Sequence, residues 1–138
     1  MAIADYERVI ELMHDTPGVK VRSADSRQAV ERYLARNPGL SFVALKNNEI
    51  IGCAMCGHDG RRGYLQHVLV LPEYRRQGIA SKLVDRCLSQ LENIGIFKSY
   101  VDVVVDNDLA RKYWNNRGWT KRDDIIRYSF NRSQDANA

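Results

Sequence analysis

Residues 75–81 form a basic turn that contains one glycine and joins an apolar segment to the expected start of a helix. Pro72 ends the apolar strand because proline cannot donate to a sheet. Gly78 stands where the helix begins, and glycine lets another group approach the backbone closely. The first N–H groups of a helix have no partner within it and carry about half a positive charge. With Arg75 and Arg76 beside them, these groups predict a binding site for a diphosphate.

An ordinary strand–turn–helix connection with a solvated basic corner is the alternative interpretation of this turn. A resemblance to a known family favours the anion site. The sequence Arg75-Arg76-Gln77-Gly78-Ile79-Ala80 resembles the Q/R-x-x-G-x-G/A signature of the GNAT N-acetyltransferase superfamily, with alanine at the last glycine position. A second block, residues 107–119, is similar to the family's N-x-x-A…Y-x-x-x-G-F segment. The resemblance covers residues 42–119.

The resemblance implies an N-acetyltransferase that moves the acetyl group of acetyl-CoA, its co-substrate, to a primary amine of a small molecule or protein. The amine attacks directly in a ternary complex. The backbone of residues 68–70 would pair with the pantetheine arm, and the amide of Val70 or Leu69 would polarise the thioester oxygen. Asn107 matches a family asparagine that binds cofactor or adjacent backbone, and it equally suits a helix N-cap. The implied cofactor-binding residues are Val68, Leu69, Val70, Arg75, Arg76, Gln77, Gly78, Ile79, Ala80, Ser81 and Asn107.

Two residues are candidates for the general base. Asp102 falls where peptide-acetylating relatives carry a glutamate, and its valine neighbours would raise its pKa if it is buried. A solvated carboxylate on the outward face of the strand is the alternative. His67 is the other candidate, because an unperturbed imidazole titrates near pH ~6.5. A histidine that only makes structural hydrogen bonds, or one that is exposed to solvent, fits the sequence equally well.

The general acid is where the sequence departs from the family pattern. The family tyrosine lies four residues before the helix-ending glycine, and counting back from Gly118 gives Trp114. An indole N–H donates a hydrogen bond but not a proton. Tyr113 is adjacent but turned by about 100° around the helix. Core packing is the alternative role for both residues. The tryptophan in place of the family tyrosine also favours a second function, a non-catalytic acyl-CoA-binding sensor or subunit of the same fold.

The composition bounds the class of protein. The chain has 138 residues, of which 44% are hydrophobic and 28% charged, as expected of one globular domain. The net charge of +4 favours an anionic partner. The arginines are spread along the chain, which argues against a nucleic-acid-binding arm. No segment has the ~20 apolar residues that span a bilayer, and no signal peptide opens the chain. We therefore expect a cytoplasmic protein without membrane contacts.

The three cysteines predict a reducing compartment rather than disulfides. Cys53 and Cys56 form a C-x-x-C pattern, but residues 49–57 are typical of a strand. Residues three apart on a strand face opposite sides, so we expect no metal site. A ping-pong route through either thiol is an alternative to direct attack.

The pattern of apolar residues predicts about four helices and about six strands. The helices are expected from Asp5, from residues 25–26, over residues 77–93 and from residues 107–108. The strands are expected at residues 41–46, 49–57, 64–71, 100–105, 120–122 and 126–130. Together they give an α/β (α+β) fold with a mixed, mostly antiparallel central sheet.

We expect one domain over residues 1–130 and a disordered polar tail at 131–138. The family usually opens with a strand, but only residues 1–4 precede the first helix, so the first strand is short or missing. A sheet edge left open in this way favours a homodimer. By the resemblance, residues 15–25 and 121–125 would select the acceptor.

Overall fold

The computed structural model describes residues 1–138, which divide into two compact units, Met1–Asp102 and Val103–Ala138. The first unit contains one sheet with strand order β1-β2-β3-β4. Three pairs of neighbours form it: β1–β2 and β2–β3 are antiparallel, and β3–β4 is parallel. The strands are β1 (Phe42–Lys46), β2 (Glu49–His58), β3 (Gly63–Val70) and β4 (Ser99–Val101). The α-helices are α1 (Tyr6–Asp15), α2 (Arg27–Arg36) and α3 (Ile79–Asn93), with α4 (Asp108–Asn116) in the second unit. The predicted mixed, mostly antiparallel sheet is confirmed.

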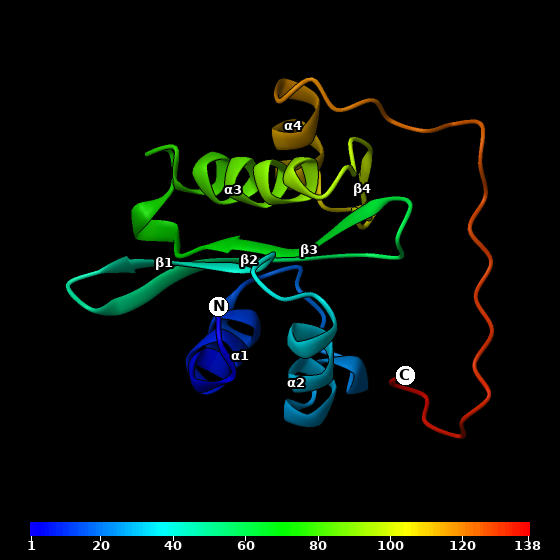
Figure 1. Cartoon of the computed structure of the whole chain (residues 1–138), viewed down its shortest axis with the longest axis horizontal. Helices are drawn as coiled ribbons and strands as arrows, with labels where there is room; N and C mark the ends of the chain where they lie inside the picture. The colour runs from blue at the N-terminus through cyan, green and yellow to red at the C-terminus, as the bar shows by residue number, and fades with distance from the viewer. The chain divides into compact units, whose positions relative to one another are not determined.

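The helices of the first unit cover both faces of the sheet. Helices α1 and α2 lie on one face and α3 on the other (Figure 1). The first face is packed by apolar side chains at helical spacing on α1, by one apolar side chain of α2 and by apolar residues of β2 and β3. These are Val9, Leu12, Met13, Val30, Ile50, Cys53, Met55 and Leu69. Helix α3 buries its own stripe on the opposite face, namely Leu83, Val84, Cys87 and Leu91.

Local signals explain several element boundaries. Ser26 caps α2 by accepting a hydrogen bond from the amide of Ala29. Asn47 and Asn48 connect β1 to β2, and both have positive φ, as a tight type I′ hairpin requires. None of the helices combines the length and the apolar composition that crossing a bilayer requires.

The prediction of six strands is wrong, because the sheet has four. Residues 120–122 and 126–130 form no strand, and β4 ends at Val101 rather than at residue 105. Ile126, Tyr128 and Phe130 alternate as strand residues do, yet the side chain of Tyr128 is 88% exposed. Alternation indicates which face could be buried, but a strand forms only against a hydrogen-bonded neighbour.

No strand precedes α1. Residues Ile3–Asp5 form a 3-10 helix instead, with the Asp5 carboxylate accepting from the amide of Ala2 at 2.7 Å. Strand β1 is therefore the first strand of the chain and one edge of the sheet. The exposed side chain of Leu45 lies on this edge strand.

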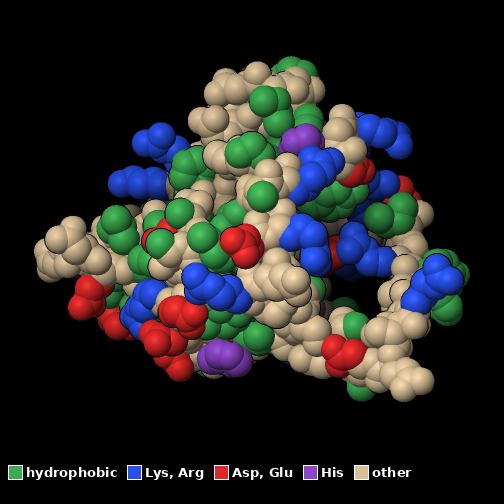
Figure 2. All heavy atoms as spheres, turned by 60° about the horizontal axis from the view of Figure 1, so that its bottom comes forward, with side chains coloured by type: hydrophobic (Ala, Val, Ile, Leu, Met, Phe, Trp, Pro, Cys, Tyr) green, Lys and Arg blue, Asp and Glu red, His purple; other side chains and the backbone are tan.

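Charged side chains of both signs are interspersed on the face that Figure 2 presents, where no continuous basic surface is visible.

Candidate active site

A β-bulge at His67 interrupts the pairing of β3 with β2. Met55 pairs with Gln66 and Cys53 pairs with Leu69, so Ala54 faces two residues, His67 and Val68. His67 has a φ of 47°, in the left-handed region that non-glycine residues rarely adopt. Such a conformation costs about 1–3 kcal/mol, and residues strained in this way cluster at functional sites. A bulge of this kind redirects a side chain, and here it turns His67 toward the α1 and α2 face.

Beyond the bulge, β3 has a free edge on its β4 side. The parallel ladder joins only Gly63, Tyr64 and Leu65 to β4, so residues 66–70 have no strand partner there. We call residues 66–70 on this side the open edge. The amide of Leu71 donates to the carbonyl of Ile51 on β2 at 2.9 Å. Because N–H groups alternate sides along a strand, the amide of Val70 faces the open edge.

The turn after β3 leads directly to the start of α3. Gly78 is the N-cap residue of α3 with a φ of 76°, and no side chain caps the helix. A Cβ at Gly78 would meet no atom within 4 Å, so the space beside it is open. Arg75 donates through Nε to the carbonyl of Val70 at 3.0 Å, which ties the turn to the end of the open edge.

Residues 75–78 are all exposed. We call residues 75–81 the diphosphate cradle. An uncapped helix start, an unhindered glycine and two cationic side chains are the features on which the predicted diphosphate site depends.

His67 pairs with a residue that the sequence did not indicate. Its Nε2 lies 2.7 Å from Oδ1 of Asp25, and these side chains are only 18% and 8% exposed. The second oxygen, Oδ2, accepts from the backbone amide of Arg22 at 2.8 Å. Asp25 lies in the segment between the first two α-helices that was expected to select the acceptor. No sequence signal pairs it with His67, because the two are 42 residues apart.

The pKa of Asp25 lies below its ordinary value of 3.8. Burial acts in the opposite direction and is the largest single influence, because it disfavours the charged carboxylate. The hydrogen bonds from His67 and Arg22, together with their positive charges, outweigh burial. Asp25 is therefore ionised at neutral pH.

This lowered pKa predicts a loss of stability in acid. Because the unfolded chain binds the proton of Asp25 more tightly than the folded chain does, the pair stabilises the fold above pH 3.8. That stabilisation disappears as the pH falls through the folded-state pKa. We expect the difference in free energy of unfolding between the wild type and Asp25→Asn to shrink on acidification. Urea unfolding between about pH 2 and 6 measures it, and a constant difference would contradict the prediction.

The other candidate base is placed differently. Asp102 follows β4 and is exposed. The burial on which its role as a base depended is therefore absent, and of the two candidates only His67 lies in a largely enclosed site.

In the second unit, Asn107 and Trp114 have structural roles. The side chain of Asn107 caps α4 by accepting from the amide of Ala110 at 3.1 Å, as the capping interpretation predicts. Trp114 is buried and makes edge contacts with Tyr113 and Trp119 at ring-centroid distances of 5.0 and 4.6 Å. Core packing therefore accounts for Trp114, whereas Tyr113 is only half-buried.

The cysteines lie on opposite faces of the sheet, as predicted. Cys53 belongs to the core beneath α1, whereas Cys56 interacts with Cys87 of α3. Burial raises the pKa of Cys53 to about 12. Its thiol donates to the backbone carbonyl of His67 at 3.4 Å and not to the imidazole. A thiol held protonated in this way is a poor nucleophile, which disfavours a ping-pong route through Cys53.

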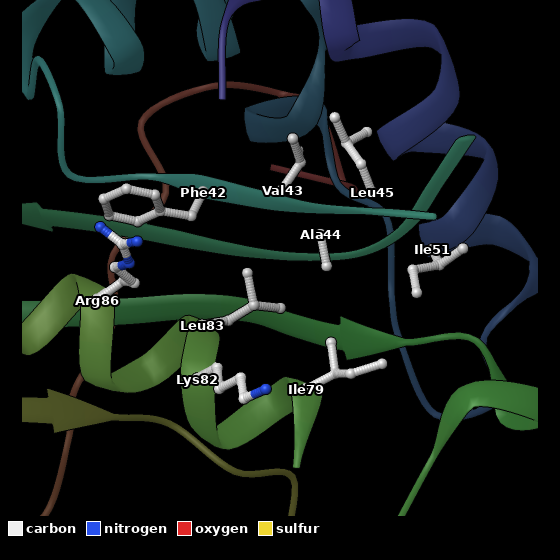
Figure 3. A pocket seen from close by; sticks show the side chains of 9 residues that line it. All are labelled: Phe42, Val43, Ala44, Leu45, Ile51, Ile79, Lys82, Leu83 and Arg86. Atoms are coloured by element: carbon white, nitrogen blue, oxygen red, sulfur yellow. The ribbon is translucent and has the colours of Figure 1, made fainter. Parts of the chain in front are cut away.

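A groove of about 460 Å³ lies between β1 and α3 (Figure 3). Ala44 points toward α3, whereas Val43 and Leu45 point away from it (Figure 3). Lys82 and Arg86 are the only charged residues of an otherwise apolar lining. The groove is bounded by the β1 edge of the sheet and does not include the open edge of β3. It is therefore separate from the predicted cofactor residues, apart from Ile79.

Comparison with known proteins identifies acetyltransferases that are similar in sequence to this chain. N-alpha-acetyltransferase 30 of Schizosaccharomyces pombe is 34% identical over 108 residues, which cover 74% of this chain and 72% of that protein. An acetyltransferase of Pectobacterium atrosepticum is 36% identical over 104 residues, covering 75% of this chain and 73% of that protein.

Solved structures share the fold. Ard1 from Thermoplasma volcanium superposes with a TM-score of 0.75 at 18% identity, covering 86% of this chain and 78% of its own. The aminoglycoside acetyltransferase AAC(6')-Iy, solved with a bisubstrate analogue, superposes with a TM-score of 0.72 at 22% identity and 95% coverage of both chains. The sequence profile described as the Acetyltransferase (GNAT) family matches residues 6–119. The chain therefore belongs to the Acetyltransferase (GNAT) family.

Proposed function

We propose that this chain transfers the acetyl group of acetyl-CoA to a primary amine of a small molecule or protein. One observation carries the proposal: the open edge of β3 leads directly into the diphosphate cradle. An extended edge suits the amide-rich pantetheine arm, and the uncapped helix suits the diphosphate. A single ligand that contains both groups in series therefore fits this part of the first unit.

In this reaction the amine nitrogen attacks the thioester carbonyl carbon, and the carbon–sulfur bond then breaks. Val70 is the proposed oxyanion donor because its amide faces the open edge, whereas the amide of Leu69 faces β2. His67 is the proposed general base, which accepts a proton from the substrate ammonium so that the neutral amine can attack. The thiolate of coenzyme A leaves and takes up a proton, with Tyr113 or water as the proposed donor.

The acceptor class is proposed from the relatives. The name of the Schizosaccharomyces pombe protein indicates an N-alpha-acetyltransferase, and that of AAC(6')-Iy indicates acetylation of an aminoglycoside. Both describe amine acceptors. We further propose that the two units act as one acetyltransferase domain, since the family match extends across both, and that the protein works in the cytoplasm.

Two measurements test the proposed function. Isothermal titration calorimetry with acetyl-CoA measures binding, and a thiol-release assay measures turnover against a panel of amines that includes N-terminal peptides and aminoglycosides. Binding with turnover on at least one amine supports the proposal. Absence of heat with acetyl-CoA would refute it.

A non-catalytic acyl-CoA sensor is the second candidate, and the buried Trp114 at the expected acid position favours it. Tight binding of acetyl-CoA without turnover on any amine would select this candidate. Unchanged kinetics in both His67→Gln and Tyr113→Phe would instead remove the roles proposed for these two residues.

We also propose that the chain forms a homodimer through β1. This strand is a sheet edge without a preceding strand, and Leu45 on it is 60% exposed. Sedimentation equilibrium is expected to give twice the chain mass of 15.8 kDa. Replacing Leu45 by lysine is expected to yield monomers, and dimers that persist in this variant would rule out the β1 edge as the contact.

A further inference from the structure

We propose that Asp25 is a positioning residue, which fixes the tautomer of His67 so that Nδ1 is the nitrogen that accepts the substrate proton. The inference rests on the proposed function, because it assigns a task to the proposed base. It starts from the short contact between Nε2 of His67 and Oδ1 of Asp25, at 2.7 Å between two largely buried side chains.

The hydrogen-bond partners of Asp25 determine which nitrogen carries hydrogen. The amide of Arg22 is a backbone donor, so Oδ2 of Asp25 must accept from it. An ionised carboxylate has no hydrogen to donate, so Oδ1 also accepts. Nε2 of His67 must therefore be the protonated nitrogen. In the neutral imidazole, Nδ1 then carries the lone pair.

Both partners are held by their own elements. Asp25 ends the 3-10 helix Ser23–Asp25, and its amide bonds the carbonyl of Arg22 at 2.9 Å. Its own carbonyl accepts from the hydroxyl of Tyr6 on α1 at 2.9 Å. His67 is fixed from the other side by the bulge in β3. A side chain oriented from both directions meets the geometric requirement for efficient proton transfer.

The paired carboxylate also compensates the imidazolium that forms when His67 takes the proton. The ammonium nitrogen loses a hydrogen, Nδ1 gains it, and the positive charge moves to a ring that already donates to Asp25. The groups that face this pair include the amide of Arg22, the positive charge of the Arg22 side chain, and the thiol of Cys53, which donates to the backbone carbonyl of His67. The net charge of the pair in the resting enzyme is −1 when the imidazole is neutral.

Replacing Asp25 by asparagine tests the tautomer directly. The side-chain carbonyl of Asn accepts from the Arg22 amide, so its NH₂ group faces Nε2, and the ring hydrogen must move to Nδ1. We expect kcat to fall by about 100-fold or more, with the dissociation constant for acetyl-CoA unchanged. Nitrogen-15 spectra of the imidazole should show the Nε2–H tautomer of His67 in the wild type and the Nδ1–H tautomer in the variant.

Asp59→Asn is the matched control, because it changes another carboxylate that accepts hydrogen bonds from backbone amides, those of Arg61 and Arg62, on the exposed turn after β2. Its kcat and its histidine spectrum are expected to match those of the wild type. The double variant Asp25→Asn/His67→Gln should be no slower than His67→Gln alone, since both changes remove one function.

An Nδ1–H tautomer in the wild type would overturn the inference, as would wild-type kcat in Asp25→Asn when His67→Gln is impaired. The nitrogen-15 spectra of His67 are recorded without an amine acceptor, so they report the tautomer independently of the proposed function. Failure of the proposed function would be detected by other measurements. It would appear as absence of acetyl-CoA binding or turnover in the wild type, whatever the tautomer of His67.

Discussion

Replacing Gly78 by valine is expected to weaken acetyl-CoA binding about 100-fold, or about 2.8 kcal/mol, while the protein remains folded. The Cβ of any other residue would project into the open space beside the start of α3, where the diphosphate is proposed to bind. It would hold the ligand away from the first amides of the helix, which interact with anions only at close range. Calorimetry with acetyl-CoA measures the change.

Gly95 provides the matched control because it follows the other end of α3. Its φ of 82° resembles the 76° of Gly78, and a Cβ there would also meet no atom within 4 Å. Left-handed backbone costs a non-glycine residue about 1–2 kcal/mol, so Gly95→Val and Gly78→Val should lose similar stability. Only Gly78→Val should lose affinity. Equal affinities in the two variants would place the diphosphate elsewhere.

Much of the cradle was predictable because its signals are local. A proline that ends a strand, a glycine at a helix start and the apolar stripe of α3 all act within a few residues. Helix α3 was expected over residues 77–93 and spans Ile79–Asn93. The two-residue turn between β1 and β2 was equally local. Such elements follow from short-range sterics and periodicity, which a single sequence contains.

The site around His67 was only partly predictable, because it depends on pairing between distant segments. His67 was a candidate base on its chemistry alone. The bulge that turns it arises from the register of β3 against β2, and neither Gln66 nor Val68 signals an extra residue. The contact with Asp25 likewise joins residues 42 positions apart. The last two strands were wrongly predicted for the same reason, since Ile126 and Phe130 alternate but form no ladder.

Replacing Val70 by proline is expected to lower kcat by about 100- to 1000-fold, the usual effect of removing one oxyanion donor. Proline has no N–H, and the amide it removes faces the open edge rather than the ladder with β2. The neighbouring amide of Leu71 still donates to Ile51, so the sheet keeps its hydrogen bonds. Proline is tolerated where a strand N–H faces an edge. The thiol-release assay measures kcat, and urea unfolding measures the stability that remains.

Val70→Ala separates the loss of the donor from the loss of packing. Val70 is buried, so alanine leaves a small cavity that costs about 1–3 kcal/mol, but it keeps the amide. If the amide stabilises the developing oxyanion, the alanine variant should turn over near the wild-type rate while the proline variant does not. Similar kcat values in the two variants would mean that the side chain, rather than the backbone donor, matters at this position. Because Leu69 presents its amide to β2, that amide cannot replace the donor of Val70 without breaking the sheet.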